Sequence, residues 1–202
     1  MRKPGTRAQG ESKKRETRIL KRETHEKSLM ANLYSHRKLA DNVFIEIAGV
    51  NFEDFEVGQV FEHRPGRTVT AEENRAHIMR SADLTMRNAD LFYNEQAYGG
   101  EQLIGEPWIL TVVTALTTKT FNKVVANLGW KNVQFPHPVR SGDTVYAESE
   151  ILGTRESQSR PDQALLHVKT RAVNQRGEEV CSFERRLLIY KRGLGPYEAA
   201  GY

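Results

Sequence analysis

The stretch Ala126–Pro161, ANLGWKNVQFPHPVRSGDTVYAESEILGTRESQSRP, decides how the rest of the chain folds. It joins a proline-rich corner at residues 135–138 to a Gly142-Asp143 turn. The two prolines lack backbone N–H donors, so the corner cannot lie in the middle of a sheet. The residues after the turn alternate as in a strand, with one face formed by Val145, Ala147, Ser149 and Ile151. The stretch therefore predicts a bend that leads into a strand at the edge of a sheet.

Three further strands are expected around this one, near residues 124–135, 164–173 and 180–190. The sequence NQRGEE between the last two is typical of a hairpin turn. Alternation predicts inward faces made of Leu166, Val168, Thr170 and Ala172 in one strand and Cys181, Phe183, Leu187 and Ile189 in the other. His167 falls on the polar face and is expected to be exposed, whereas Cys181 is expected to be a small buried hydrophobe.

The segment before these strands predicts a shorter strand and a helix. A strand near Gln59–His63 should turn at Pro65-Gly66. The pattern Thr70-x-x-Glu73 is a capping box, which predicts a helix through about Ala82. Its buried face should include Ala76, Ile78 and Met79, with His77 solvated.

A second helix is expected over about Trp108–Asn122, because Pro107 suits the first turn of a helix. This segment is apolar on most sides, which is typical of a buried helix. Between the two helices, residues 84–100 form a short, partly helical excursion rich in polar side chains. Together these elements predict an α+β fold in which one curved antiparallel sheet wraps around one buried helix.

Charge divides the chain into parts. Residues 1–30 hold ten Lys or Arg and four Asp or Glu, whereas the rest of the 202 residues hold 20 basic and 22 acidic side chains. We therefore expect a basic, flexible extension over residues 1–48 with a short helix at Ser28–Ala40, one domain over 49–192, and a loose tail over 193–202. Nucleic-acid association would rest on the extension alone and is not expected for the folded domain, which is nearly neutral.

Cysteine usage and hydropathy bear on the compartment. The single cysteine excludes an internal disulfide and fits the reducing cytoplasm. No apolar run approaches the roughly 18 residues that a membrane span needs, so we expect no membrane partner. Motifs for dinucleotide binding, for a P-loop and for a Cys/His metal site are all missing from the sequence, and no metal site is expected.

The segments ANLGW, FPHPVRSGDT and ESEILGTRESQSRP resemble the MaoC-like dehydratases, which are hotdog-fold hydratases acting on enoyl-CoA thioesters. The resemblance covers about residues 51–192 and implies a single hotdog domain that pairs into a homodimer or a larger homo-oligomer. The implied activity is that of a hydro-lyase, with coenzyme A as part of the acyl-CoA substrate and no separate cofactor. The stretch ANLG…GDT is also similar to the mesaconyl-CoA (β-methylmalyl-CoA) hydratase branch, which handles branched dicarboxylic thioesters.

Hydration of an enoyl thioester needs a base for water, an acid for the α-carbon and donors for the enolate oxygen. The N–H groups of Gly105 and Glu106, at the expected start of the buried helix, are candidate donors. Gly105 would also let a ligand approach the backbone closely. The alternative is that Gly105 and Glu106 form an ordinary helix start.

The R-specific hydratases of this family place an Asp and a His five residues apart in a D-x-N-P-x-H pattern, from which this chain departs. One alignment puts Asn88 and Tyr93 at the two positions, and another puts Arg87 and Phe92 there. Asn88 cannot act as a base, and tyrosine is a poor base at neutral pH. We assign Asn88 and Tyr93 an orienting role.

Two carboxylates in the same segment, Asp90 and Glu95, are also five residues apart and are the candidate proton-transfer groups. The alternative is that Asp90 caps a short helix and Glu95 is a solvated helix charge. If the site lacks working acid–base groups, the protein would be a hotdog subunit that binds acyl-CoA or supports an active partner subunit.

Four more residues are candidates for substrate binding: Arg87, Glu106, His137 and Arg140. A second carboxylate on the substrate would suit the guanidinium of Arg87 or Arg140. Arg140 is also a candidate for the phosphates of coenzyme A. His137 lies between two prolines, either at the cleft or as a structural corner residue.

Overall fold

The computed structural model describes residues 36–47, 49–197 and 200–201, which belong to two compact units divided after residue 47. The described part of the first unit is an antiparallel hairpin of β1 (His36–Ala40) and β2 (Val43–Glu46). The helix expected at Ser28–Ala40 is therefore wrong for residues 36–40. Asn42 adopts a left-handed φ of 60° in the turn, which lets the two strands pair. The rest of that helix and the basic segment 1–30 lie outside the described residues.

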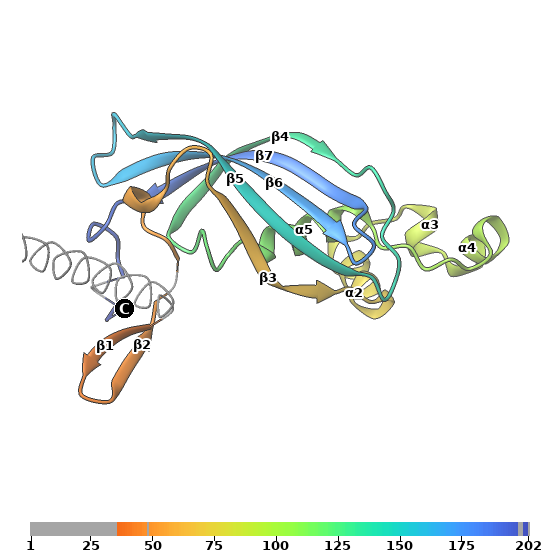
Figure 1. The fold of residues 1–202 in the computed structure, drawn as a ribbon. Helices are drawn as coiled ribbons and strands as arrows, with labels where there is room; N and C mark the ends of the chain where they lie inside the picture. The colour runs from red at the N-terminus through yellow and green to blue at the C-terminus, as the bar shows by residue number, and fades with distance from the viewer. Residues whose placement is uncertain (1–35, 48, 198–199, 202) are drawn as a thin grey trace, which may run out of the picture. The chain divides into compact units, whose positions relative to one another are not determined.

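The second unit contains one five-stranded antiparallel sheet (Figure 1). Its strands, in spatial order, are β3 (Val60–Thr68), β5 (Thr144–Glu156), β6 (Gln163–Asn174), β7 (Glu179–Tyr190) and β4 (Val124–Gln134). The alternation expected for β5, β6 and β7 is confirmed, since every residue assigned to their inward faces is buried. The position expected for β5 at the edge of the sheet is wrong, because β5 lies between β3 and β6. Cys181 is among them, and its burial raises the pKa of its thiol to about 12.

The helices of this unit precede β4 in the chain. They are the 3₁₀ turn η1 (Phe52–Asp54) and the helices α2 (Ala71–Ser81), α3 (Met86–Ala89), α4 (Leu91–Tyr98) and α5 (Glu106–Leu116). Val112 and Val113 of α5 are fully buried in one core cluster with Val145, Ala172 and Phe183 of three strands. The expected architecture, a sheet around one central helix, is confirmed. Figure 1 shows α3 and α4 lying beyond one end of the sheet.

Helix α5 ends earlier than expected, at Leu116 instead of Asn122. A threonine run explains the early end: the hydroxyls of Thr117 and Thr118 donate to the carbonyls of Thr114 and Ala115, each at 2.7 Å. Such local hydrogen bonds compete with the helical ladder. The helix is also less enclosed than its composition indicated, because Thr111 and Ala115 are exposed in this chain.

Helix α2 begins as the capping box predicts. The Thr70 hydroxyl accepts from the Glu73 N–H, and the Glu73 carboxylate accepts from the Thr70 N–H. Its buried face differs from the expectation, because Asn74 and Ile78 are buried whereas Ala76 and Met79 are exposed. The ring of His77, expected to be solvated, lies 5.2 Å from the ring of Trp108 and is half-buried.

The turn predicted at Pro65-Gly66 is wrong, because β3 continues through it to Thr68. Pairing with β5 passes from His63–Ala147 to Arg67–Val145, so the extra residues form a bulge inside the strand. Gly66 is required there, since a Cβ would lie 2.5 Å from the Tyr146 ring. A bulge accommodates proline and glycine without ending the strand.

The segment after β7 is held to the domain, contrary to the loose tail expected from residue 193. The Tyr197 hydroxyl donates to the carbonyl of Asn122 at 3.0 Å, and the Lys123 ammonium lies 5.8 Å from the Tyr197 ring. No helix within the described ranges has the length and apolar character needed to cross a membrane.

Candidate active site

A hollow opens in front of the N-terminal end of α5. Four chain segments contribute to its lining: residues 85–88 around α3, residues 103–109 at the start of α5, the corner 135–139 after β4, and Val180 of β7. Of the candidate residues, it brings together Arg87, Asn88, Glu106 and His137. Tyr93, Asp90 and Glu95 are not among the residues that line it. We call it the α5 hollow.

Asn74, which sequence reasoning missed, holds the start of α5. Its side chain accepts from the Gly105 N–H at 2.9 Å and donates to the Leu103 carbonyl at 3.3 Å. The Gly105 N–H, a candidate donor to the substrate, is thus occupied by Asn74. Glu106 is the first residue of the helix, and its N–H has no carbonyl one turn before it within α5. A polar residue on a helix otherwise rich in charge gives no sequence signal of such a role.

Asn88 is oriented by Asp83, a second residue that the sequence did not single out. The Asn88 amide donates to the Asp83 carboxylate at 3.2 Å. The hydroxyl and N–H of Thr85 also donate to that carboxylate, at 2.5 and 2.9 Å. These hydrogen bonds, those of Thr85 first, hold the pKa of Asp83 below its usual range. The Asp-x-Thr spacing is a local turn signal that could have revealed this contact.

The two carboxylates proposed for proton transfer instead have the structural roles given as the alternative, a helix cap for Asp90 and a solvated helix charge for Glu95. Asp90 is the N-cap of α4 and accepts from the Tyr93 N–H at 2.9 Å. Glu95 is exposed on α4, and its carboxylate occupies the space that a Cβ at Gly100 would need, so this side chain folds over the glycine. The ring of Tyr93 packs near that of Tyr98, with 6.2 Å between centroids.

The two candidate arginines differ in their partners. Arg140 is paired, because its Nε lies 2.7 Å from a Glu101 carboxylate oxygen. Arg87 makes no ion pair within the described ranges, and its buried Nε has no hydrogen-bond partner there. Its guanidinium lies 5.1 Å from the Tyr98 ring centroid. Arg87 is therefore the arginine of the α5 hollow whose charge is available to a ligand.

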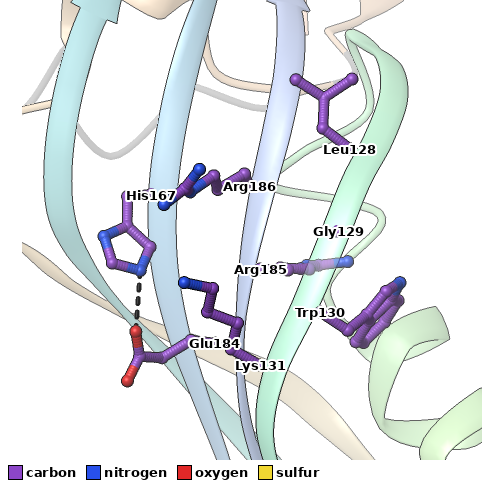
Figure 2. A pocket seen from close by; sticks show the side chains of 8 residues that line it. All are labelled: Leu128, Gly129, Trp130, Lys131, His167, Glu184, Arg185 and Arg186. Carbon is purple, nitrogen blue, oxygen red and sulfur yellow. Dashed lines mark hydrogen bonds and ion pairs between the residues drawn. The ribbon is translucent and has the colours of Figure 1, made fainter.

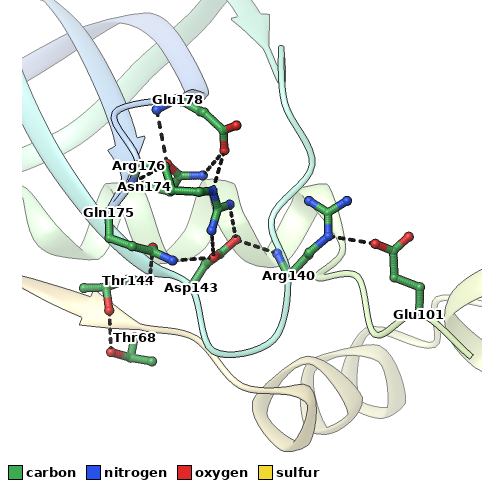
Figure 3. A network of polar contacts seen from close by, with 9 residues as sticks. All are labelled: Thr68, Glu101, Arg140, Asp143, Thr144, Asn174, Gln175, Arg176 and Glu178. Atoms are coloured by element: carbon green, nitrogen blue, oxygen red, sulfur yellow. Dashed lines mark hydrogen bonds and ion pairs between the residues drawn. The ribbon is translucent and has the colours of Figure 1, made fainter.

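The corner that forms one wall of the α5 hollow is anchored by Asp143 (Figure 3). Asp143 is 3 % exposed, and its carboxylate accepts from the Arg176 guanidinium at 2.7 and 3.1 Å, from Gln175 at 2.7 Å and from the Arg140 N–H at 2.9 Å. The hydrogen bonds from Arg176, followed by that from Arg140, lower the pKa of Asp143 to about 2. Asp143 thereby joins the corner to the β6–β7 hairpin.

A second polar cluster lies at the other end of α5 and is largely buried. His63 is 4 % exposed, with Nε2 2.9 Å from the Ser149 hydroxyl and Nδ1 3.2 Å from the Thr120 hydroxyl. Burial, followed by the charges of Arg185 and Arg64, lowers the pKa of His63 to about 4.

Arg185 of β7 is also 4 % exposed, and sequence reasoning missed it. Its Nη2 donates to the Thr117 hydroxyl at 2.6 Å, and its Nε has no partner in the described part of the chain. Its guanidinium lies 5.3–5.7 Å from three aromatic ring centroids, those of Phe121, Trp130 and Phe183. Burial lowers its pKa to about 10. The C-terminal end of a helix favours a cation at this place.

Figure 2 shows this part of the sheet, with Arg185 directed toward Trp130 of β4. The adjacent Glu184 instead meets His167, with 2.8 Å between carboxylate and ring nitrogen. His167 is therefore paired and half-buried instead of freely solvated, although it lies on the outer face as expected.

Solved structures identify the fold. The chain is similar to a putative MaoC domain protein dehydratase from Chloroflexus aurantiacus, at 21 % identity and a TM-score of 0.66 over 71 % of this chain and 45 % of that one. It is similar to Rv0216 of Mycobacterium tuberculosis, described as a double hotdog fold, at 23 % identity and a TM-score of 0.67 over 74 % of this chain and 46 % of that one. It is also similar to R-hydratase PhaJ1 from Pseudomonas aeruginosa, at 19 % identity and a TM-score of 0.56 over 72 % of this chain and 89 % of that one. The protein has the hotdog fold.

A family model for mesaconyl-CoA hydratase matches residues 32–201, so the chain belongs to the mesaconyl-CoA hydratase family. It is 31 % identical to the mesaconyl-CoA hydratase of Cereibacter sphaeroides over 72 % of this chain and 42 % of that protein. It is 28 % identical to the β-methylmalyl-CoA dehydratase of Chloroflexus aurantiacus over 68 % and 40 %. The chain thus spans about two fifths of the length of these curated relatives.

Proposed function

We propose that this protein catalyses the reversible hydration of a 2-enoyl-CoA thioester in the α5 hollow. The observation that carries the proposal is the start of α5, where Glu106 shares one hollow with Asn88 and His137. The names of the relatives, mesaconyl-CoA hydratase and β-methylmalyl-CoA dehydratase, support the same reaction class. Coenzyme A enters as part of the substrate.

The helix start supplies the electrostatic part of this chemistry. Addition of water to the β-carbon moves negative charge onto the thioester oxygen, which becomes an enolate oxygen. The Glu106 N–H and the positive end of the α5 dipole stabilise charge at that position. Asn74 serves as a positioning residue, because its hydrogen bonds to Gly105 and Leu103 hold the helix start in place.

The unpaired guanidinium of Arg87 supports a branched dicarboxylic substrate. A carboxylate at the far end of the acyl group would supply the anion that Arg87 lacks in the described chain. Arg140 is less suited, since its ion pair with Glu101 would have to break. We propose a thioester of the mesaconyl-CoA type on this ground.

The test is a hydration assay on the purified chain with crotonyl-CoA and mesaconyl-CoA, followed as loss of the conjugated thioester. We expect turnover of both, faster for mesaconyl-CoA, and the reverse reaction with the matching 3-hydroxyacyl-CoA. Butyryl-CoA, which has no double bond, serves as a binding control. Binding of butyryl-CoA without turnover of either enoyl thioester contradicts the proposed hydratase activity.

The alternative is a hotdog subunit that binds acyl-CoA and depends on a partner. It is favoured by the positions of Asp90 and Glu95 outside the α5 hollow. The edge strand β4 also leaves Leu128, Trp130 and Val133 between 37 and 52 % exposed, which supports pairing with a second hotdog domain in a homo-oligomer. Turnover that appears only after a second hotdog chain is added would favour this alternative.

A further inference from the structure

The ring of His137 is held by the backbone of another strand. Its Nδ1 lies 2.9 Å from the carbonyl oxygen of Glu179, the first residue of β7. A carbonyl oxygen accepts hydrogen bonds only, so Nδ1 must carry the hydrogen. In the neutral ring Nε2 is then the basic nitrogen. The contact therefore selects one tautomer of His137.

The backbone on both sides of His137 is also restrained. Pro136 and Pro138 fix their own φ angles. The next residue, Val139, accepts from the Ile104 N–H at 2.9 Å, and Ile104 directly precedes Gly105, the N-cap of α5. Two residues further on, the Ser141 N–H donates to the Gln102 carbonyl at 3.0 Å. The corner and the start of α5 are thus joined directly, and His137 lines the α5 hollow from this joint.

We propose that His137 is the acid–base group of the hydration reaction, with Nε2 as the reacting atom. This inference rests on the proposed function. Nε2 takes a proton from water as the water oxygen bonds to the β-carbon, and the electron pair of the double bond moves onto the thioester oxygen. The enolate then collapses, and its α-carbon takes the proton back from Nε2. The ring ends neutral, and one water has been added across the double bond.

The other groups of the segment are less suited to this role. Asn88 has no basic nitrogen, and its amide is engaged by Asp83. Asp90 and Glu95 do not line the α5 hollow. Glu106 does line it and is exposed at the first turn of α5. It is the competitor that the experiment must separate from His137.

The test compares His137→Asn with His167→Gln in the full chain. The asparagine amide can replace Nδ1–H as donor to the Glu179 carbonyl, but it supplies no base. His167 lies on the outer face of the sheet with Glu184 and is the matched control. We expect His137→Asn to lower kcat at least about 100-fold, the usual scale for an acid–base group. The Kd for butyryl-CoA and the thermal midpoint should stay near the wild-type values. His167→Gln should keep its kcat.

A pH profile separates proton transfer from a structural effect. Wild-type kcat should fall on the acid side, as general-base catalysis by an imidazole requires, and the residual activity of His137→Asn should lack that limb. If His137→Asn fails to fold, His137→Gln is measured in the same way.

Four outcomes overturn the inference. His137 alone is excluded if its variant keeps kcat within about 3-fold of wild type. It is also excluded if the acid limb survives in the pH profile of that variant. Loss of the acid limb in Glu106→Gln, with His137→Asn active, assigns the role to Glu106. An inactive wild type defeats the proposed function itself, and His137's role with it.

Discussion

The two ends of α5 place polar groups in opposite surroundings. At its N-terminal end the α5 hollow admits solvent to His137 and Glu106, both of them exposed. At its C-terminal end His63 and Arg185 are each 4 % exposed, and the pKa of each is lowered chiefly by burial. A perturbed pKa often accompanies function, but here His63 and Arg185 are not among the residues that line the α5 hollow.

The difference shows that solvent access and hydrogen-bond partners distinguish a candidate reactive histidine from a structural one in this fold. His63 has a neighbour at both ring nitrogens, the hydroxyls of Ser149 and Thr120. His137 uses only its Nδ1, toward a backbone carbonyl. We call the C-terminal end of α5, with His63 and Arg185, the closed end, and the N-terminal end, with the α5 hollow, the open end. The closed end should control stability, whereas the open end should control turnover and substrate choice.

The largest expected effect is a loss of stability in acid that originates at the closed end. The pKa of His63 falls from 6.5 to about 4 on folding, so the unfolded chain binds the proton more tightly. Stability from the neutral ring is complete above pH 6.5 and declines as the pH falls toward 4, by about 3 kcal/mol in total. Urea unfolding from pH 7 to 4 should show this decline.

His63→Gln should remove that part of the pH dependence, and His167→Gln should leave it in place. The same slope in wild type and His63→Gln would mean that His63 is not the group that titrates.

The next effect sharpens the role of the open end in substrate choice. Arg87→Met should lower kcat/KM for mesaconyl-CoA by 10- to 100-fold, about 1.5–3 kcal/mol, because a charge-assisted hydrogen bond is lost. Crotonyl-CoA, which has no second carboxylate, should be affected much less. Arg140→Met is the matched control, since Arg140 is already paired with Glu101. Equal losses on both substrates would rule out recognition of the carboxylate by Arg87.

Asp143→Asn tests whether the wall of the open end needs its anchor. The carboxylate is buried and its pKa is about 2, against 3.8 for an ordinary Asp. Its contribution is complete above pH 3.8 and declines as the pH falls toward 2. We expect the substitution to lower the free energy of unfolding at pH 7 by about 1–2 kcal/mol.

Because the corner carries His137, kcat should fall as well in Asp143→Asn. Unchanged stability and kcat would show that the corner holds its shape without Asp143. Glu148→Gln, which alters an exposed ion pair with Arg171, is the control.

The smallest effect is expected for Arg185→Met. Replacing a buried charge with an apolar side chain of similar length is often neutral or slightly stabilising, so unfolding should change by less than about 1 kcal/mol. Turnover should be unaffected, because Arg185 lies at the closed end. A loss above about 3 kcal/mol would instead show that the guanidinium is needed to hold that end together.

Local patterns in the sequence predicted most of the fold. Alternation identified the inward faces of β5, β6 and β7, and the Thr70–Glu73 capping box identified the start of α2. The bulge at Pro65-Gly66 could not be predicted, because it depends on pairing with β5 some 80 positions further along the chain. The end of α5 was missed because the hydroxyls of Thr117 and Thr118 compete with the helix.

The site was harder to predict, since its contacts join distant segments. Asn74 meets Gly105 across 31 positions and His137 meets Glu179 across 42. Arg185 did carry a signal, because it stands between Phe183 and Leu187 in the inward alternation of β7. Four of the residues that line the α5 hollow were candidates, but the sequence could not separate them from Asp90 and Glu95.

The hydrogen bonds from Ile104 to Val139 and from Ser141 to Gln102 have a consequence for protein engineering. They join residues 102–104 to residues 139–141 through main-chain atoms, so the joint does not depend on the side chains of these residues. A chimera that transplants the FPHPV corner alone into another hotdog scaffold would leave the main-chain groups of these hydrogen bonds without their partners. Transplanting both segments together would carry the complete joint into the new host.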